Sequence, residues 1–314
     1  MTSEAPSRAF RPDPAAIALV AIAVALNGLA SVWMSRRVHG WLPVQASSAA
    51  PYVDDLFALE AGIGTFIFLG CVAVMAWTIL FNRAPKYDMD NGAPIEGNLR
   101  LEIVWTVVPL MVVLAIAWHA IQINQVLATL GGKVRVSSGS EALAVAGSAA
   151  SDEPVGPIQV IGRQWSWEFI YPEGVHSTEL HLPVDRRARL ELISMDVLHG
   201  FYVPAFRLKQ DLVPGSVIAY ALTPTREGRY RLRDSMFSGG YFAANQTDVV
   251  VESEDAYRAW LTDALRRPLV PAANPATELW RLRQERGDRG WATVPPAPPP
   301  LVHVDADPNA PHDA

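Results

Sequence analysis

Few residues in this sequence have the types and spacing that a chemical site requires. The chain of 314 residues has seven histidines and a single cysteine, Cys71. One cysteine excludes an internal disulfide framework and any site for which this chain alone supplies two thiolates. The histidines show no metal-ligand spacing, and we find no Ser/His/Asp arrangement and no phosphate-binding glycine loop. His176 and His181 are five residues apart, which would place them on opposite faces of a continuous strand.

An acid and a tryptophan are the other candidates. Glu102 lies just before the apolar run Val104–Ile121. A carboxylate at such a position is either an interfacial charge or a group that collects protons at the mouth of a hydrophilic path. Trp165 and Trp167 lie in one expected strand, where tryptophans usually fill a barrel core or cover an interface. Both a structural and a functional interpretation therefore stay open for these residues.

Three apolar runs must position these side chains: Ala15–Met34, Leu56–Phe81 and Val104–Ile121. Because about 20 helical residues span a hydrocarbon core of about 30 Å, the second and third runs predict a transmembrane hairpin over residues 50–124. The alternative is a buried helix pair of a soluble protein. The first run, within residues 1–35, is either a secretory signal or a retained signal-anchor helix. We favour the anchor because the run is longer than a usual signal core.

Charge predicts the orientation of these helices. The N-terminus and the loop 82–102 carry Arg8, Arg11, Arg83, Lys86 and Arg100, and fewer basic residues flank the helices on the other side. The positive-inside rule therefore places this side in the cytoplasm and the C-terminal domain outside. The formal net charge is −6, which argues against a nucleic-acid partner because phosphate neutralisation needs clustered Lys and Arg.

The outer part changes from helical to β-type patterning. Residues 125–157 are rich in Gly, Ser and Ala and predict a linker. Short runs separated by Gly and Pro then predict an all-β sandwich or small barrel over 158–267, closed by a helix that Ser253 caps. Residues 268–314 are proline-rich and predict an extended, disordered tail, with a docking role as the alternative. The expected strands are Ile158–Arg163, Trp165–Tyr171, Glu179–Leu182, Arg187–Ser194, Val217–Leu222, Arg229–Arg233 and Asp248–Glu252.

Two windows of the sequence resemble subunit II of the haem–copper terminal oxidases, the family of cytochrome c oxidase and its quinol-oxidising relatives. The first, Asn98–Pro109, contains Glu102 and begins the last membrane helix. The second, Gly162–Gly215, contains the motif Asp196-Val-Leu-His199. Residues 40–57 also resemble the cyanobacterial branch of this family. The order of these segments after a membrane hairpin makes the resemblance specific.

The resemblance implies a fold and two roles. It implies a membrane hairpin, with the signal-anchor helix before it, that carries an outward-facing cupredoxin-like barrel. It also implies that Glu102 lies at the mouth of a proton pathway into subunit I. In the members that oxidise cytochrome c, the tryptophan that matches Trp165 is where electrons enter from the docked cytochrome.

Those members hold a dinuclear copper centre in the barrel. Its ligands are the histidine of an Asp-Val-Leu-His motif and a loop with the spacing Cys-x-Glu-x-Cys-x3-His-x2-Met. His199 matches the first ligand, but residues 200–252 contain no cysteine and no histidine. The loop positions hold Asp234, Met236, Ser238, Phe242 and Asn245. Because two metals that share an electron need bridging thiolates, we expect no copper in this chain and His199 as a hydrogen-bonded barrel residue.

The resemblance therefore predicts a subunit II that carries no redox group of its own. We expect it to serve a respiratory oxidase that reduces dioxygen to water with quinol electrons, with haem and copper in subunit I. The expected partners are subunit I, subunit III, a membrane quinol bound by subunit I, and the lipid bilayer. We expect a multi-pass protein of a bacterial inner membrane, or of a cyanobacterial thylakoid or plasma membrane, with its C-terminal domain in the periplasm or lumen. The alternatives are a divergent cytochrome c oxidase subunit 2 and a membrane-anchored cupredoxin-like assembly or binding protein.

Overall fold

The computed structural model describes residues 14–81, 83, 87, 97–131, 135–137, 154–287, 293–307 and 311. Its contacts divide the chain into two compact units. The helical unit contains residues 1–42 and 54–119, and the β unit contains residues 43–53 and 120–314. Arg8, Arg11 and Lys86, on which the predicted orientation partly depends, lie outside the described residues.

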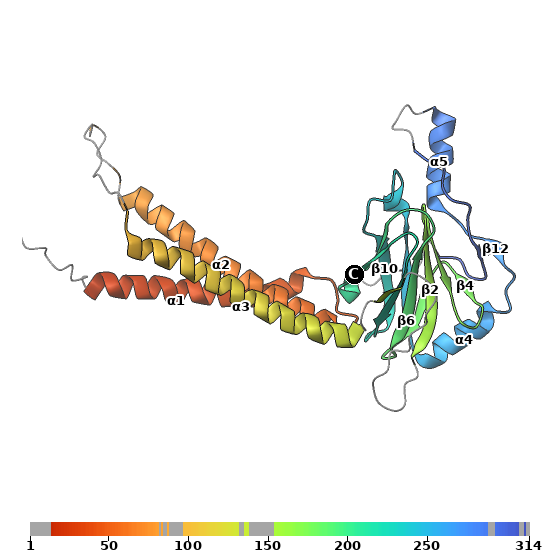
Figure 1. The fold of residues 1–314 in the computed structure, drawn as a ribbon, viewed down its shortest axis with the longest axis horizontal. Coiled ribbons are helices and arrows are strands. Elements are labelled where there is room, and N and C mark those ends of the chain that lie inside the picture. Colours follow the sequence, from red (N-terminus) through yellow and green to blue (C-terminus); the bar gives the residue numbers. More distant parts are fainter. Residues whose placement is uncertain are drawn as a thin grey trace, which may run out of the picture. The chain divides into compact units, whose positions relative to one another are not determined.

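Three long helices form most of the helical unit (Figure 1): α1 (Pro14–Arg37), α2 (Ala50–Phe81) and α3 (Leu99–Gly131). The short 3-10 helix η1 (Val38–Trp41) follows α1. Each of the three is long and apolar enough to cross a bilayer, and at most 6% of each apolar window is buried within the chain. The three predicted membrane runs are therefore confirmed as helices whose apolar surfaces face outward along the described chain.

Helices α1 and α2 approach each other closely. The Asn27 side-chain amide in α1 donates a hydrogen bond to the carbonyl oxygen of Phe66 in α2 at 2.9 Å. A Cβ atom placed on Gly62 would lie 3.2 Å from Cβ of Ser35, so a larger residue would push the helices apart. Small residues at such a crossing let the two backbones meet, as is common between membrane helices.

Part of the predicted linker is helical. Helix α3 continues to Gly131, past the expected end of the hairpin at residue 124. The strand β1 (Arg135–Ser137) then pairs antiparallel with β9 (Val217–Leu222). Residues 132–134 and 138–153 of the predicted linker lie outside the described residues.

Two sheets build the β unit, and their strands do not follow sequence order. The first sheet has the order β1-β9-β6-β2-β3-β4 and the second β5-β11-β10-β7-β8. Figure 1 shows β6, β2 and β4 of the first sheet and β10 of the second. The remaining strands of the first sheet are β2 (Val155–Arg163), β3 (Ser166–Ile170), β4 (His176–Ser177) and β6 (Ala188–Ser194). The second sheet consists of β5 (Leu180–Pro183), β7 (His199–Val203), β8 (Leu208–Leu212), β10 (Gly228–Asp234) and β11 (Gln246–Glu252).

All seven predicted strands are confirmed, and the core lies where their patterns place it. Strand β6 alternates buried and half-buried residues along its whole length, as a strand with one face on the core requires. The largest side chains that are fully buried are aromatic or branched: Trp165, Trp167, Tyr171, Tyr230, Phe169, Phe201, Phe206, Ile158, Leu180, Leu182, Leu190 and Leu192. The 3-10 helices η2 (Pro204–Phe206) and η3 (Phe242–Ala244) lie in the connections of the second sheet.

The segment before α2 belongs to the β unit. The Ala46 amide donates to the carbonyl oxygen of Ala205 at 3.0 Å, and the Ser47 hydroxyl donates to that of Phe206 at 2.8 Å. Ala46 is fully buried in the core of the sandwich. Residues 43–53 therefore add to the sandwich, although they precede it by about 100 positions in the sequence.

The proline-rich tail differs from the prediction of a disordered segment. After α4 (Glu254–Ala264) the chain forms β12 (Val270–Pro271), α5 (Pro275–Arg286) and β13 (Leu301–Val302), of which Figure 1 labels α5 and β12. Strands β12 and β13 pair antiparallel, and Val302 is fully buried. The prediction rested on composition alone. It did not consider that a few apolar side chains in this segment are buried against the β unit.

Candidate functional site

The buried imidazole of His199 is the centre of the site. His199 is the first residue of β7 and is fully buried. Its Nδ1 lies 2.7 Å from Oδ2 of Asp234, and its Nε2 lies 2.7 Å from Oδ1 of Asp196. The ring also meets Trp167 edge-on, at a centroid distance of 6.1 Å. Both ring nitrogens are therefore paired with a carboxylate, which only the protonated imidazole, with two N–H donors, can satisfy.

Asp234, the last residue of β10, accepts hydrogen bonds from the loop that follows it. Its Oδ1 accepts hydrogen bonds from the backbone amides of Gly200 at 2.8 Å and Met236 at 3.0 Å. Its Oδ2 accepts from the Ser238 hydroxyl at 2.9 Å and the Asn245 side-chain amide at 3.1 Å, in addition to His199. The residues of the loop are thus arranged around one carboxylate, which uses nearly all of its acceptor capacity.

Strand order explains why these residues meet. Strand β10 pairs antiparallel with β7, and Asp234 lies opposite Phe201 in that register. The start of β7 and the end of β10 therefore lie at the same edge of the sheet. Gly200 leaves room for the loop, because a Cβ atom there would lie 2.2 Å from the Ser235 hydroxyl oxygen.

His199, Asp196 and Asp234 shift one another's pKa values. Burial lowers the pKa of His199, but the hydrogen bonds to Asp196 and Asp234 outweigh burial and raise it to about 9. Burial raises the pKa of Asp234, but the hydrogen bonds from His199 and the amides of Gly200 and Met236 lower it below its ordinary value. The pKa of Asp196 is lowered in the same way by His199 and the amides of Val197 and Gln164. The group is therefore an imidazolium between two carboxylates at neutral pH.

Trp165 lies beside the same loop. It is 1% exposed, and its indole N–H donates to the carbonyl oxygen of Ser238 at 3.1 Å. Its ring packs edge-on against Tyr241, at a centroid distance of 5.1 Å. A Cβ atom on Gly239, which has φ of +116°, would lie 2.8 Å from the indole ring. The tryptophan is thus enclosed by the loop, as a structural residue would be.

The structure brings most of the predicted positions together. The side chains of Ser238 and Asn245 each donate a hydrogen bond to the Asp234 carboxylate, and Met236 donates one through its backbone amide. The Phe242 ring instead packs edge-on against Phe237 at a centroid distance of 5.3 Å. Asp196 was not predicted as a partner of His199. The spacing of three residues within the Asp196-Val-Leu-His199 motif was the available signal.

Glu102 lies in the helical unit, one turn into α3. The Asn98 side chain accepts hydrogen bonds from the amides of Arg100 at 3.1 Å and Leu101 at 3.3 Å, and so caps the N-terminus of α3. Glu102 is exposed in this chain, with its backbone amide bonded to the Asn98 carbonyl oxygen at 2.9 Å. An acid near a helix N-terminus is favoured by the helix dipole, so this position suits a carboxylate in either role.

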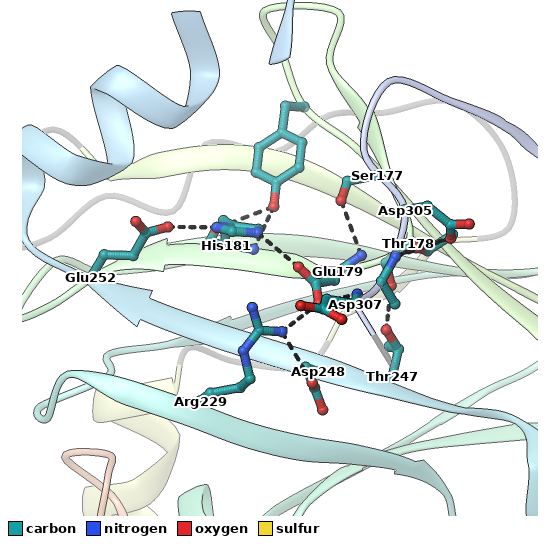
Figure 2. Close-up of polar contacts among 12 residues, drawn as sticks. Ser177, Thr178, Glu179, His181, Arg229, Thr247, Asp248, Glu252, Asp305 and Asp307 are labelled. Atoms are coloured by element: carbon teal, nitrogen blue, oxygen red, sulfur yellow. Dashed lines mark hydrogen bonds and ion pairs between the residues drawn. The ribbon is translucent and has the colours of Figure 1, made fainter. Parts of the chain in front are cut away.

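A second charged cluster was not foreseen (Figure 2). Glu179, buried between β4 and β5, pairs with Arg229, and Arg229 also bonds Asp248 at 3.1 Å. His181 bonds Glu252 and stacks on Trp260, with ring centroids 3.9 Å apart. His176 and His181 were expected on opposite faces of one strand, but they lie in β4 and β5, which belong to different sheets. Pairings that join separate strands leave no periodic signal in the sequence.

The donor atoms of the His199 site do not fit a dinuclear copper centre. The site offers one imidazole, carboxylates, a hydroxyl and an amide, whereas shared copper requires thiolate bridges. The two ring nitrogens of His199 point in different directions, so Asp196 and Asp234 lie on separate sides of the ring. Among the described residues, no group of three or more His, Cys, Asp or Glu is arranged to hold a metal ion.

Helices long enough to cross a membrane, followed by a β-sandwich with a buried histidine, define the class of membrane-anchored proteins that carry an extramembrane β domain. Within it, residues 36–123 match the family of the cytochrome c oxidase subunit II transmembrane domain. Residues 175–254 match that of the cytochrome c oxidase subunit II periplasmic domain. The chain belongs to the cytochrome c oxidase subunit II family and is a subunit of a haem–copper terminal oxidase, an oxidoreductase complex.

Relatives of two kinds are similar to the chain. Cytochrome c oxidase subunit 2 of Thermostichus vulcanus is 32% identical over 265 residues, which cover 74% of this chain and 80% of that protein. Quinol oxidase subunit 2 of Bacillus subtilis is 28% identical over 213 residues, covering 66% and 61%. The crystal structure of the periplasmic domain of subunit II of cytochrome oxidase of Bradyrhizobium japonicum has 23% identity and a TM-score of 0.34, covering 35% of this chain and 92% of that one.

Proposed function

We propose that this chain is the subunit II of an oxidase that reduces dioxygen to water with electrons from a membrane quinol. The observation that carries the proposal is the hydrogen bonding of the Asp234 carboxylate. Asp234 stands where the family resemblance places a bridging cysteine, and its carboxylate is saturated by His199, Gly200, Met236, Ser238 and Asn245. A loop organised around a carboxylate has no thiolate through which electrons from a docked cytochrome could reach subunit I.

The chain would then act as a scaffold of the complex. Its three helices expose their apolar surfaces and suit packing against subunit I, subunit III and lipid. Haem, copper and the quinol site belong to subunit I in this proposal. Glu102 would collect protons for the oxidase on the cytoplasmic side, and the β unit would cover subunit I on the periplasmic or lumenal side of the membrane.

One observation favours a second candidate, a divergent cytochrome c oxidase subunit 2. The relative from Thermostichus vulcanus carries that name and is more similar than the quinol oxidase subunit of Bacillus subtilis, at 32% against 28% identity. In that case copper would have to be bound with ligands other than the family's set.

Metal content and donor use separate the first two candidates. The complex is purified through this chain, and its copper is measured per haem together with the near-infrared band of a dinuclear centre. We expect one copper per oxidase, no near-infrared band, and oxygen consumption that a reduced quinol supports and reduced cytochrome c does not. More than one copper per oxidase, or a near-infrared band of a dinuclear centre, would refute the quinol proposal.

A further inference from the structure

Residues 301–307, which we call the latch, lie against β4, the outermost strand of the first sheet. The His303 amide donates a hydrogen bond to the carbonyl oxygen of His176 in β4 at 2.8 Å. The Thr178 amide donates one back to the carbonyl oxygen of Val304 at 3.1 Å. Backbone bonds that run both ways between two extended segments are the pattern of strand pairing. The latch therefore extends the sheet beyond β4.

The side chain of His303 adds a contact that depends on its protonation state. Its Nδ1 accepts a hydrogen bond from the backbone amide of His176 at 3.0 Å. Because a backbone N–H can only donate, this bond exists only while Nδ1 of His303 carries no proton. Once Nδ1 is protonated, two N–H groups face each other, and the His176 amide loses its acceptor.

The neighbouring side chains add charge to this contact. The rings of His176 and His303 have centroids 5.9 Å apart. Nδ1 of His176 lies 2.9 Å from Oε1 of Glu168 in β3, and Oε2 of Glu168 accepts from Arg163 in β2 at 2.6 Å. The one carboxylate of this row is thereby divided between two basic side chains. Two protonated imidazoles at this distance repel each other.

The acids of the latch bind to other groups (Figure 2). Oδ1 of Asp305 accepts from the Thr178 hydroxyl at 2.9 Å, and its Oδ2 accepts from the Ala273 amide at 2.7 Å. The Asp307 amide donates to the buried carboxylate of Glu179 at 3.3 Å. These contacts persist while the carboxylates are charged. Only the His303 contact changes in the pH range in which histidines titrate.

The direction of the pH effect follows from the environment of His303. Burial and the neighbouring His176 lower the pKa of His303 below its ordinary value of 6.5. The docked latch therefore binds a proton less tightly than the free latch does. Its docking is fully stabilised above about pH 6.5 and weakens as the pH falls below that value.

We propose that the latch is a pH-sensitive device, docked on β4 at neutral pH and released in mild acid. Neutral His303 supplies the acceptor that completes the pairing with β4. Protonated His303 removes that acceptor and places a charge beside His176. The inference goes beyond the proposed function, because it holds whichever electron donor the oxidase uses.

Labelling of a buried cysteine measures docking of the latch. In the Cys71→Ser background, Val302→Cys places the only thiol of the chain at a side chain that is fully buried when the latch is docked. Its rate of reaction with a maleimide is divided, at each pH, by the rate of Met195→Cys in the same background. Met195 is 60% exposed, so the ratio removes the effect of pH on the thiol itself. We expect this ratio to rise about fivefold from about pH 8 to about pH 5 in the full-length chain in detergent.

Two further variants separate His303 from Asp305. His303→Asn keeps an acceptor oxygen near the position of Nδ1 but does not titrate, so the ratio should stay low at both pH values. Asp305→Asn weakens the anchor, so the ratio should be higher at every pH and should keep its rise in acid. His39→Gln is the control, because His39 is an exposed histidine of the helical unit and its replacement should leave the curve unchanged.

A ratio near one at about pH 8 would show that the latch is not docked and would overturn the proposal. So would a ratio that does not change with pH, or a rise in acid that His303→Asn retains. Loss of the rise in Asp305→Asn would assign the titration to the carboxylate and refute the role of His303. None of these measurements involves copper or an electron donor, so their failure leaves the proposed function untouched.

Discussion

At the scale of single residues, His199 and its two carboxylates form a unit that is stable only when complete. The imidazolium carries one positive charge between Asp196 and Asp234. The side chains of His199 and Asp234 are fully buried, whereas that of Asp196 is partly exposed. Removing one partner of a buried ionic group leaves a charge without compensation, which costs more than the pair itself contributes. The loop after β10 therefore depends on His199 even where no metal is bound.

The stability of the β unit should depend on pH through His199. Its folded pKa of about 9 lies above the unfolded value of 6.5, so its contribution is complete below 6.5 and is lost as the pH rises through about 9. This difference corresponds to about 3 kcal/mol. The lowered pKa values of Asp196 and Asp234 mean that their contributions are lost only in acid. Denaturant unfolding of the full-length chain in detergent, followed between pH 6 and 10, measures the effect.

The variant His199→Gln should remove this alkaline dependence. We expect the β unit to lose about 3–5 kcal/mol at pH 7, because Asp234 remains buried without its cation. His39→Gln is the matched control, since His39 pairs with Asp55 at an exposed position and should matter by less than about 1 kcal/mol. An unchanged pH profile in His199→Gln would show that another group titrates.

The positions of this site could be predicted from the sequence, but its contacts could not. Counting from the Asp-Val-Leu-His motif identified His199 and the aligned loop positions that begin at Asp234. The bond between those two residues joins positions 35 apart and exists because β7 and β10 are neighbours. Strand order across a sheet is a tertiary property, and one-dimensional patterns do not contain it.

At the scale of elements, regular patterns in the sequence were predictive. The length of the apolar runs predicted the three helices, and short runs with polar–apolar alternation predicted seven strands. Strands β7 and β8 were missed: β7 begins with His199 and Gly200, and β8 reads Leu-Lys-Gln-Asp-Leu. The position of residues 293–307 was not predicted, because it depends on contacts of Asp305 and Val304 with residues about 127 positions earlier.

The cap of α4 offers a test at this scale. The Ser253 hydroxyl accepts a hydrogen bond from the Ala256 amide at 3.3 Å, as the sequence predicted for this position. We expect Ser253→Ala to destabilise the β unit by about 1 kcal/mol, because one amide of the first turn loses its acceptor. Thr262→Ala, in the same helix but exposed and away from the cap, should change stability by less than about 0.5 kcal/mol. Denaturant titration of the two full-length variants compares them, and equal losses would contradict a capping role.

At the scale of the whole molecule, we propose that Glu102 connects this chain to proton supply in the oxidase. The variant Glu102→Gln keeps the size and hydrogen-bonding capacity of the side chain but cannot carry a proton. We expect oxygen consumption by the purified complex to fall about tenfold. That is less than the ~100-fold typical of a positioned proton donor at a reacting centre, because Glu102 would serve only the mouth of the path.

Glu60→Gln is the matched control for this measurement. Glu60 is also an exposed acid within a membrane helix, but it lies in α2 and precedes Glu102 by more than 40 residues. Turnover in Glu60→Gln should equal that of the unaltered complex. Full activity in Glu102→Gln would contradict the proton-uptake role and show that Glu102 is only an interfacial carboxylate.

The distance along the chain between residues 293–307 and their partners has a consequence for biogenesis. Thr178 and Asp305 are 127 residues apart, and the parallel pairs β2–β6 and β5–β11 also join strands that are not adjacent in sequence. Contacts of long sequence separation form late, after the entropy of closing a large loop has been lost. A ribosome must therefore finish residues 293–307 before the edge of the first sheet at β4 is covered. Chains that stop short of these residues would leave β4 as an open edge for chaperones or proteases to recognise.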